Sequence, residues 1–241
     1  MSLPMFFYTG DFAQADELKL EEDIARHVVQ VLRMQPDEQL ELCNGKGKSA
    51  TAIITKAEKK NLVVRIEQIQ VHSPRTPNLN LGVAFTKNSS RNEWLLEKAT
   101  ELGAANIIPI MAARTEREKI RYDRWLNIMK AALIQSQQYH LPELLEASSL
   151  KEILQRFNGV EQKLIGHCND TLSRFPIKEV MQKQKDTLAL IGPEGDFTLE
   201  EVKLCEAHGF AGMSLVSQRL RTETAAMAVC AYFNLINHSE A

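Results

Sequence analysis

The sequence predicts an α/β protein in two parts: a small strand-rich barrel, then a larger domain in which helices cover a parallel sheet on both faces. Short strand-like runs dominate residues 1–72, whereas strands and helices alternate from residue 79 to the end. Between them, residues 73–78 contain two prolines, which exclude a helix and favour an extended connector. We therefore expect domains at residues 1–72 and 79–241, joined by a linker at residues 73–78.

The composition is that of an ordinary globular protein. Of 241 residues, 44% are hydrophobic and 25% are charged, and no apolar run approaches the roughly 18 residues of a membrane span. Residues 1–7 lack the pattern of a secretory signal. The four cysteines form no C-x-x-C pair and the six histidines no H-E-x-x-H motif, so we expect a cytoplasmic protein without disulfides or metal. With a net charge of −2, any contact with nucleic acid requires locally concentrated positive charge.

The N-terminal elements follow from alternation and turn signals. The expected strands are residues 5–8, 40–43, 50–55 and 62–69. Asn44-Gly45 follows the second of these and is a strong hairpin signal. Ile24, Val28 and Val31 recur at helical spacing, which predicts one amphipathic helix between the first strand and the hairpin.

In the second domain, strand-like runs alternate with helical segments. The expected strands are residues 79–85, 107–111, 163–168, 188–191 and 213–216. Helix starts are indicated by capping signals at Ser90-x-x-Glu93, at Ser148 or Ser149, and at Thr198-x-x-Glu201. Residues 222–237 form a strongly apolar closing helix. In such a parallel sheet, ligands bind at the carboxyl ends of the strands.

The loop Gly192-Pro193-Glu194-Gly195 follows a buried strand and precedes a capped helix. Its glycines allow positive φ angles and close approach of the backbone to a ligand. The helix that follows offers free N–H groups. The alternative is an ordinary strand-to-helix turn. The loop is not a P-loop, because no Gly-Lys-Ser/Thr follows it.

A second segment, residues 219–226, combines two arginines, two threonines and a glutamate at the start of the apolar closing helix. One interpretation is purely structural: Thr222 is the N-cap, Glu223 interacts with the helix dipole, and the arginines are solvated. That interpretation leaves Arg219 and Arg221 unexplained, since they lie between an apolar strand and an apolar helix.

Together these segments resemble the two signature segments of the ribosomal RNA small subunit methyltransferase E family, G-P-E-G and L-R-T-E-T-A. Further stretches resemble that family, namely residues 97–103 with Ile108-Pro109, Gln135-Ser136 with Pro142, and His27 with residues 31–33. The resemblance covers nearly the whole chain. The chain departs from the family's pattern in four places: Asp196 replaces a second glycine, Val216 a glycine, Gln218-Arg219 an Arg-Ile pair, and Gln138 an arginine.

The resemblance implies a PUA-like RNA-binding barrel and a SPOUT α/β domain with a C-terminal trefoil knot. It implies a homodimer that uses S-adenosyl-L-methionine (SAM), without a metal, to methylate N3 of a uridine in 16S ribosomal RNA, within the small ribosomal subunit. Two alternatives stay open. One is another SPOUT methylation, such as ribose 2′-O methylation, and the other is a non-catalytic RNA-binding assembly factor.

The resemblance also assigns site residues. Three loops are expected to bind the cofactor: Gly166, His167 and Cys168; Ile191, Gly192, Pro193, Glu194 and Gly195; and Leu215, Val216, Ser217, Leu220, Thr222 and Thr224. Arg221 is the expected catalytic donor, because deprotonation of uridine N3 places negative charge on O2 and O4. Glu223 is expected either to orient Arg221 or to act as the base. The expected RNA contacts are Arg33, Arg91, Arg114 and Arg219.

Overall fold

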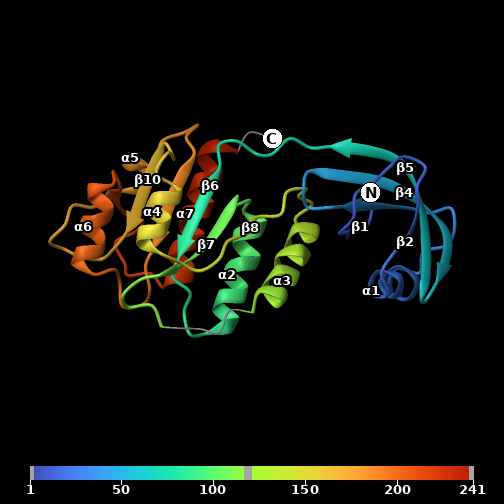
Figure 1. The fold of residues 1–241 in the computed structure, drawn as a ribbon, viewed down its shortest axis with the longest axis horizontal. Coiled ribbons are helices and arrows are strands. Elements are labelled where there is room, and N and C mark those ends of the chain that lie inside the picture. The colour runs from blue at the N-terminus through green and yellow to red at the C-terminus, as the bar shows by residue number, and fades with distance from the viewer. Residues whose placement is uncertain (1–2, 117–120, 239–241) are drawn as a thin grey trace. The chain divides into compact units, whose positions relative to one another are not determined.

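The computed structural model describes residues 3–116 and 121–238 of the chain. It divides into two compact units, coloured along the chain in Figure 1. The first comprises residues 1–74 together with residues 133–141, and the second comprises residues 75–132 and 142–241. The sequence contained no sign that residues 133–141, which lie far along the chain, belong to the first unit.

The first unit is built on a five-stranded sheet in the order β1-β3-β4-β5-β2. Its strands are β1 (Met5–Phe7), β2 (Glu17–Lys19), β3 (Gln39–Cys43), β4 (Lys48–Glu58) and β5 (Asn61–Val71). All neighbouring strands are antiparallel except β1 and β3. The predicted hairpin after residues 40–43 is confirmed as the β3–β4 pair. Strand β2 was not predicted, because its three residues carry no alternation long enough to recognise.

The helix predicted from Ile24, Val28 and Val31 is only partly correct. A short α-helix, α1 (Glu22–Arg26), continues into a π-helical turn, η1 (His27–Val31). The Leu32 N–H donates to the His27 carbonyl, five residues back, so the turn is wider than an α-helical one. Val28 is fully buried, but Val31 is rotated off the core face and 65% exposed.

Residues 133–141 complete the first unit through backbone and ring contacts. The Gly47 N–H donates to the Tyr139 carbonyl, and the Leu141 N–H donates to the Gly45 carbonyl, at 2.8 Å each. The Tyr139 ring stacks on His72, with ring centroids 3.4 Å apart. Burial and the nearby Glu41 carboxylate raise the pKa of the Tyr139 phenol, so it stays neutral.

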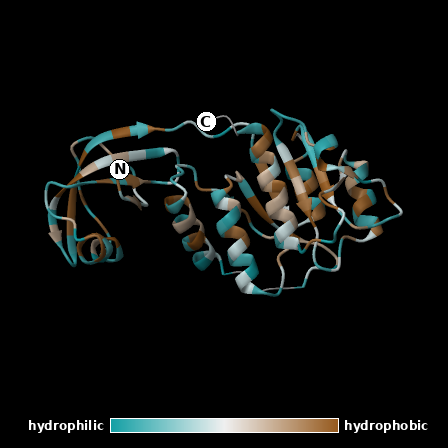
Figure 2. Cartoon of the chain, turned by 180° about the vertical axis from the view of Figure 1, so that it is seen from behind, coloured by the Kyte–Doolittle hydropathy of each residue, from teal (hydrophilic) through white to brown (hydrophobic). Residues whose placement is uncertain are grey.

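The second unit contains an eight-stranded sheet in which all pairs are parallel, as predicted. The main path is β11-β13-β10-β12-β6-β7-β8, and β9 pairs with β7. The strands are β6 (Leu79–Val83), β7 (Asn106–Met111), β8 (Glu143–Leu144), β9 (Ser148–Ser149), β10 (Gln162–Gly166), β11 (Phe175–Pro176), β12 (Thr187–Ile191) and β13 (Ala211–Ser214). Every residue of β6 and β12 is buried, and the central strands are hydrophobic in Figure 2.

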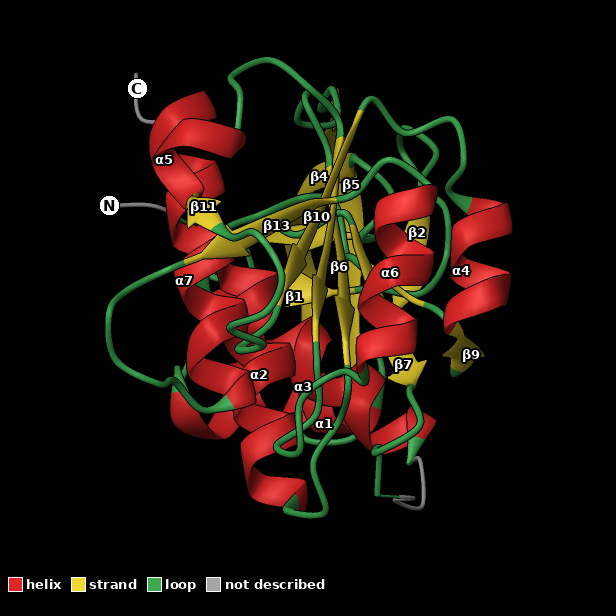
Figure 3. Cartoon of the chain, turned by 90° about the vertical axis from the view of Figure 1, so that its left-hand side faces the viewer, coloured by secondary structure: helices red, strands yellow, loops and turns green. Residues whose placement is uncertain are grey.

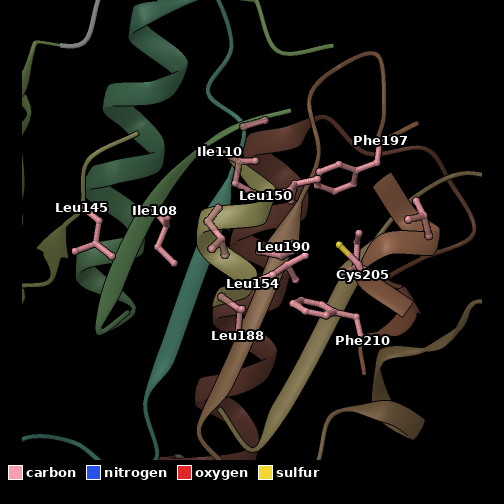
Figure 4. Close-up of a cluster of buried hydrophobic side chains, with 14 residues drawn as sticks. Ile108, Ile110, Leu145, Leu150, Leu154, Leu188, Leu190, Phe197, Cys205 and Phe210 are labelled. Carbon is pink, nitrogen blue, oxygen red and sulfur yellow. The ribbon is translucent and has the colours of Figure 1, made fainter. Parts of the chain in front are cut away.

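Helices cover both faces of this sheet. They are α2 (Ser89–Glu101), α3 (Tyr122–Gln135), α4 (Leu150–Arg156), α5 (Ile177–Val180), α6 (Leu199–Ala207) and α7 (Thr222–Asn237). In Figure 3, α2 and α7 lie on one face, and α4 and α6 lie on the other. Figure 4 shows the core under α4 and α6, where Leu154 and Cys205 meet Leu188 and Leu190 of the sheet. In the described part of the chain, no helix has the length and apolar character needed to span a membrane.

Two helix starts agree with the predicted capping boxes and one does not. The side chains of Ser149 and Thr198 each accept a hydrogen bond from the backbone N–H of the N3 residue. The side chain of that N3 glutamate in turn accepts from the backbone N–H of the N-cap residue. The predicted box at Ser90 and Glu93 is wrong. Helix α2 begins two residues earlier than predicted, with Asn88 as its N-cap, whose side chain accepts from the Arg91 N–H.

Candidate active site

The carboxyl ends of three neighbouring strands meet at one edge of the parallel sheet. Strand β10 lies between β12 and β13, and Gly166 is in register with Ile191 on one side and Met213 on the other. A cavity of about 650 Å³ opens there, lined by the loops that follow the three strands and by the start of α7. This is the place where parallel sheets bind ligands.

The structure brings most of the expected cofactor residues together around this cavity. Those lining it are Gly166, His167, Cys168, Ile191, Gly192, Pro193, Glu194, Leu215, Val216, Ser217, Leu220 and Thr222. Gly195 and Thr224 do not line it. Lining residues that sequence reasoning missed are Asp170, Arg174, Asp196, Met213, Ser214, Gln218 and Ala225. Their closeness in sequence to the three loops was the one available signal.

The loop after β12 is fixed by contacts from two other segments. Thr222 is the first residue of α7, after Arg221 as N-cap and not the N-cap itself, and its hydroxyl donates to the Gly192 carbonyl at 3.0 Å. The guanidinium of Arg114 donates to the Gly195 carbonyl at 2.7 Å. The Phe197 ring packs so close to Gly192 that an added Cβ would lie 3.0 Å from it. A side chain at residue 192 would therefore require the Phe197 ring to shift by a few tenths of an ångström.

The expected positive φ angles do not fall on the glycines of this loop. Neither Gly192 nor Gly195 has a positive φ, whereas Asp196 has a φ of 65°. Aspartate tolerates the left-handed region better than most residues because its short side chain can bond locally. The Asp196 carboxylate does so, accepting from the Phe197 N–H at 2.9 Å.

His167 lies buried beside the cavity. Its Nδ1 accepts from the Asn169 N–H at 3.3 Å, which leaves the ring proton on Nε2. That Nε2 is buried and has no partner within the described chain. Burial is the main cause that lowers the pKa of His167 below 6.5, and Arg174 adds to the effect, while Asp196 and Glu206 oppose it. The imidazole is therefore neutral at physiological pH.

The segment after β10 passes directly over β13. An added Cβ at Gly212 would lie 2.4 Å from the Ser173 carbonyl oxygen and 3.0 Å from His167 Nε2. Arg174 fixes the same segment by donating to the His167 carbonyl at 3.1 Å and to the Asp170 carboxylate at 2.6 Å. Because Gly212 has no side chain, the segment from His167 to Arg174 can pack directly against β13.

The charged residues near the start of α7 are arranged differently from expectation. Arg221 lines the cavity, is exposed, and forms no ion pair with any residue that the structure describes. Glu223 is buried and lies near Arg91, with 3.6 Å between its Oε1 and Arg91 Nε. Arg91 also bonds Glu194 at 3.0 Å. The ion pair of Glu223 is therefore with Arg91 and not with Arg221.

The four arginines expected to contact RNA have different surroundings. Arg219 is exposed and lines the cavity, and Arg114 is exposed but bonded to the Gly195 carbonyl. Arg91 is shared by two carboxylates. Arg33, in the first unit, is exposed and has a φ of 58°. Residues 3–116 and 121–238 contain no group of three His, Cys, Asp or Glu side chains placed to hold a metal ion.

Comparison with known proteins identifies both parts of the chain. Residues 73–234 match the model of an RNA methyltransferase domain, and residues 20–67 match that of an RNA methyltransferase PUA domain. The ribosomal RNA small subunit methyltransferase E of Rickettsia conorii is 28% identical over 244 residues, covering 100% of this chain and 99% of that protein.

Two solved structures are similar throughout. One, from Legionella pneumophila, is described as a methyltransferase in complex with its bound cofactor SAM. It has a TM-score of 0.85 and 31% identity, and the match covers 98% of this chain and 99% of that one. The other is a ribosomal RNA small subunit methyltransferase E from Neisseria gonorrhoeae bound to SAM, with a TM-score of 0.87, 26% identity and 100% coverage of both chains.

The fold, the cavity at the strand ends and the two matched domains define an RNA methyltransferase with a PUA domain. Within that class, the chain belongs to the ribosomal RNA small subunit methyltransferase E family. The family predicted from the signature segments is thus confirmed.

Proposed function

We propose that this protein transfers a methyl group from SAM to N3 of a uridine in 16S ribosomal RNA. The observation that carries the proposal is the cavity at the strand ends, whose lining includes the guanidinium of Arg221, without an ion-pair partner among the described residues. Membership of the family supports RNA as the substrate, and two similar structures are of methyltransferases that hold SAM.

The cavity suits a cofactor of this kind. Its volume of about 650 Å³ lies within the range of roughly 300 to 1,000 Å³ common for small-molecule sites. Ile191, Met213 and Leu220 offer apolar surface, and the loops between them offer backbone donors and acceptors. We propose that these loops bind SAM, which when bound supplies an electrophilic methyl group. The chain's own contribution is then mainly to position the reactants.

Uridine N3 is a protonated imide at neutral pH, so it must lose a proton before it can accept a methyl group. The negative charge then spreads over O2 and O4. We propose that Arg221 stabilises this charge, because its donors are not engaged by another described residue and it lines the cavity. The planar guanidinium can reach an oxygen through either of two terminal nitrogens.

Neither role that the sequence left open for Glu223, orienting Arg221 or acting as the base, is supported by its surroundings, because Glu223 does not line the cavity. The carboxylate does not pair with Arg221, and its second oxygen, Oε2, is enclosed and lacks a partner in the described residues. Its proximity to Arg91 supports a positioning role instead. We propose that Glu223 keeps Arg91 beside Glu194 of the loop after β12.

The remaining features implied by the family complete the proposal. The first unit is a PUA-like barrel that contacts RNA with Arg33, and Arg91, Arg114 and Arg219 contact RNA from the second unit. The C-terminal segment forms a trefoil knot, and the protein acts as a cytoplasmic homodimer on the small ribosomal subunit. SPOUT methyl transfer of this kind requires no metal.

The test is a methylation assay with mapping of the product. Purified protein, small ribosomal subunits that lack the modification and methyl-labelled SAM should yield label on N3 of one uridine of 16S ribosomal RNA. Label on a ribose 2′-oxygen would instead assign a different SPOUT activity. Calorimetric binding of RNA without any binding of SAM would assign an assembly factor.

Binding of the cofactor has a separate expected outcome. SAM at 100 times its dissociation constant should raise the free energy of unfolding by about 2.7 kcal/mol. A chelator is present throughout, so that binding is tested in the absence of metal ions. A thermal shift measures this effect. No shift at millimolar SAM would contradict the cofactor site.

A further inference from the structure

Asp196 occupies the position at which the family's signature segment has a second glycine. Its φ of 65° lies in the left-handed region, where glycine is the residue with the least strain. The backbone here has a shape that suits glycine, yet the residue at this position carries a carboxylate.

The two oxygens of Asp196 bond two different loops of the cavity. Oδ1 accepts from the Phe197 N–H, which belongs to its own turn, at 2.9 Å. Oδ2 accepts from the Cys168 N–H, in the loop after β10, at 2.8 Å. Bonds from a backbone N–H to an ionised carboxylate are stronger than those between neutral groups. One side chain therefore ties together two loops that are 28 residues apart in sequence.

Both tied loops line the cavity, and Asp196 and Cys168 are themselves in the lining. The loop after β12 has other supports, from Thr222 and Arg114. The loop after β10, in contrast, is joined to the loop after β12 by the hydrogen bond from the Cys168 N–H to Asp196. Without it, residues 168–170 would be fixed mainly from the side of Arg174.

We infer that Asp196 is a positioning residue for the cofactor, which holds the loops after β10 and β12 at the spacing that the bound cofactor requires. This inference rests on the proposed function, since it takes the cavity to be the SAM site. A site whose loops are already in place before binding loses less conformational entropy when the ligand binds. Both oxygens of Asp196 already accept from backbone N–H groups, so we expect it to affect affinity and not the chemical step.

Replacing Asp196 with Gly and with Asn provides the test. Asp196→Gly removes the carboxylate and leaves a residue that adopts this φ without strain, so the variant should fold. We expect its dissociation constant for SAM to rise about tenfold, because the charge-assisted hydrogen bond that joins the two loops is lost. Asp196→Asn keeps one acceptor oxygen and tolerates the left-handed region, so it should recover part of the loss.

Glu200→Gln is the matched control, because it removes a negative charge near the start of α6 from a side chain that does not line the cavity. It should bind SAM as the wild type does. Two further measurements separate positioning from a general loss of structure. Hydrogen exchange of the Cys168 amide should accelerate about tenfold in Asp196→Gly. The KM for SAM should rise, while kcat at saturating SAM stays close to wild type.

Wild-type affinity in Asp196→Gly, or an unchanged exchange rate at Cys168, would overturn the inference. A fall in kcat at saturating SAM would also overturn it, because Asp196 would then affect the chemical step. Failure of the wild type to bind SAM would be a different result, which removes the proposed function. If hydrogen exchange at Cys168 were then still faster in Asp196→Gly, the bond between Asp196 and Cys168 would have a structural role only. The proposed role of Asp196 in cofactor binding would be overturned together with the cofactor site.

Discussion

Two arginines of the site, Arg91 and Arg221, differ in what their guanidinium groups contact. Arg91 bonds Glu194 at 3.0 Å and lies 3.6 Å from Glu223, so its charge is already balanced. Arg221 lines the cavity and is left without an acidic partner in the described parts of the chain. The sequence left open whether Glu223 orients Arg221 or acts as the base, whereas in the structure the ion-pair partner of Glu223 is Arg91.

Arg221→Ala should lower single-turnover methylation by about 10² to 10³ and leave SAM affinity nearly unchanged, because one donor to the developing oxyanion is lost. Arg221→Lys should restore only part of the rate, since an ammonium lacks the planar two-pronged geometry. Single-turnover rates at saturating RNA measure both effects. If Arg221→Ala keeps its rate and loses only RNA affinity, with a salt dependence shallower by about one unit of slope, Arg221 is a docking residue.

His167 should make stability depend on pH. Burial lowers the pKa of His167 in the folded protein. Just below about pH 6.5, this residue therefore binds a proton in the unfolded chain but not in the folded protein. The contribution of the neutral imidazole is therefore complete above pH 6.5 and is lost as the pH falls from 6.5 towards the lowered pKa. Melting temperatures of wild type and His167→Gln between pH 7.5 and 5 test this. An equally steep fall in both proteins would show that other groups, such as His238, cause it.

The sequence located the loops of the site better than the contacts within them. Gly192 and Arg221 were recognised because their motifs are local in sequence. The partner of Asp196 is the amide of Cys168, and the partner of Glu223 is Arg91. Both pairs join segments brought together by strand order, and strand order is not readable from local patterns.

At the scale of elements, the segment between β10 and β11 depends on one glycine of its neighbouring strand. The Ser173 carbonyl lies over Gly212 of β13, where a side chain would collide with it. This carbonyl is a backbone atom, so it cannot turn aside as a long side chain would. The element that carries His167 and Arg174 is therefore positioned by close packing as well as by hydrogen bonds.

Gly212→Ala should destabilise the protein by about 1 to 3 kcal/mol, the usual cost of overpacking. It should also weaken SAM binding, because residues 167–174 must move. Gly159→Ala is the matched control, since an added Cβ there meets nothing within 4 Å. Denaturant unfolding of both variants measures the difference, and equal stabilities would contradict the close contact at Gly212.

Strands and helices were predictable where hydrophobic residues recur at strand or helix spacing over a long enough stretch of sequence. The five strands predicted for the second domain overlap β6, β7, β10, β12 and β13, although the last was predicted at residues 213–216 and spans Ala211–Ser214. The closing helix 222–237 has the predicted bounds. The π-helical turn at His27–Val31 was not foreseen, because its residues have the spacing of an ordinary helix. The short strands β2, β8, β9 and β11 are set by their neighbours in the sheet and not by their own two or three residues.

At the scale of the whole molecule, we expect a homodimer that is required for activity. Helix α7 buries Val229, Cys230 and Phe233 in its own unit but exposes 65% of Leu235. In a monomer, Leu235→Glu would be an ordinary surface change worth at most about 0.5 kcal/mol. In a dimer that buries this face, it should shift the protein towards monomers and lower activity. Light scattering at assay concentration measures the mass, and an active wild-type monomer would contradict the dimer.

The discontinuous first unit has a consequence for how the chain is made and recombined. Tyr139 stacks on His72, and residues 133–141 belong to the same unit as residues 1–74. During synthesis, the N-terminal unit therefore cannot complete its contacts until residue 141 has left the ribosome, when more than half of the protein has been translated. A gene fragment that ends at Pro74 would likewise encode an incomplete unit. A chimera that exchanges this unit with a relative must carry both segments from the same parent.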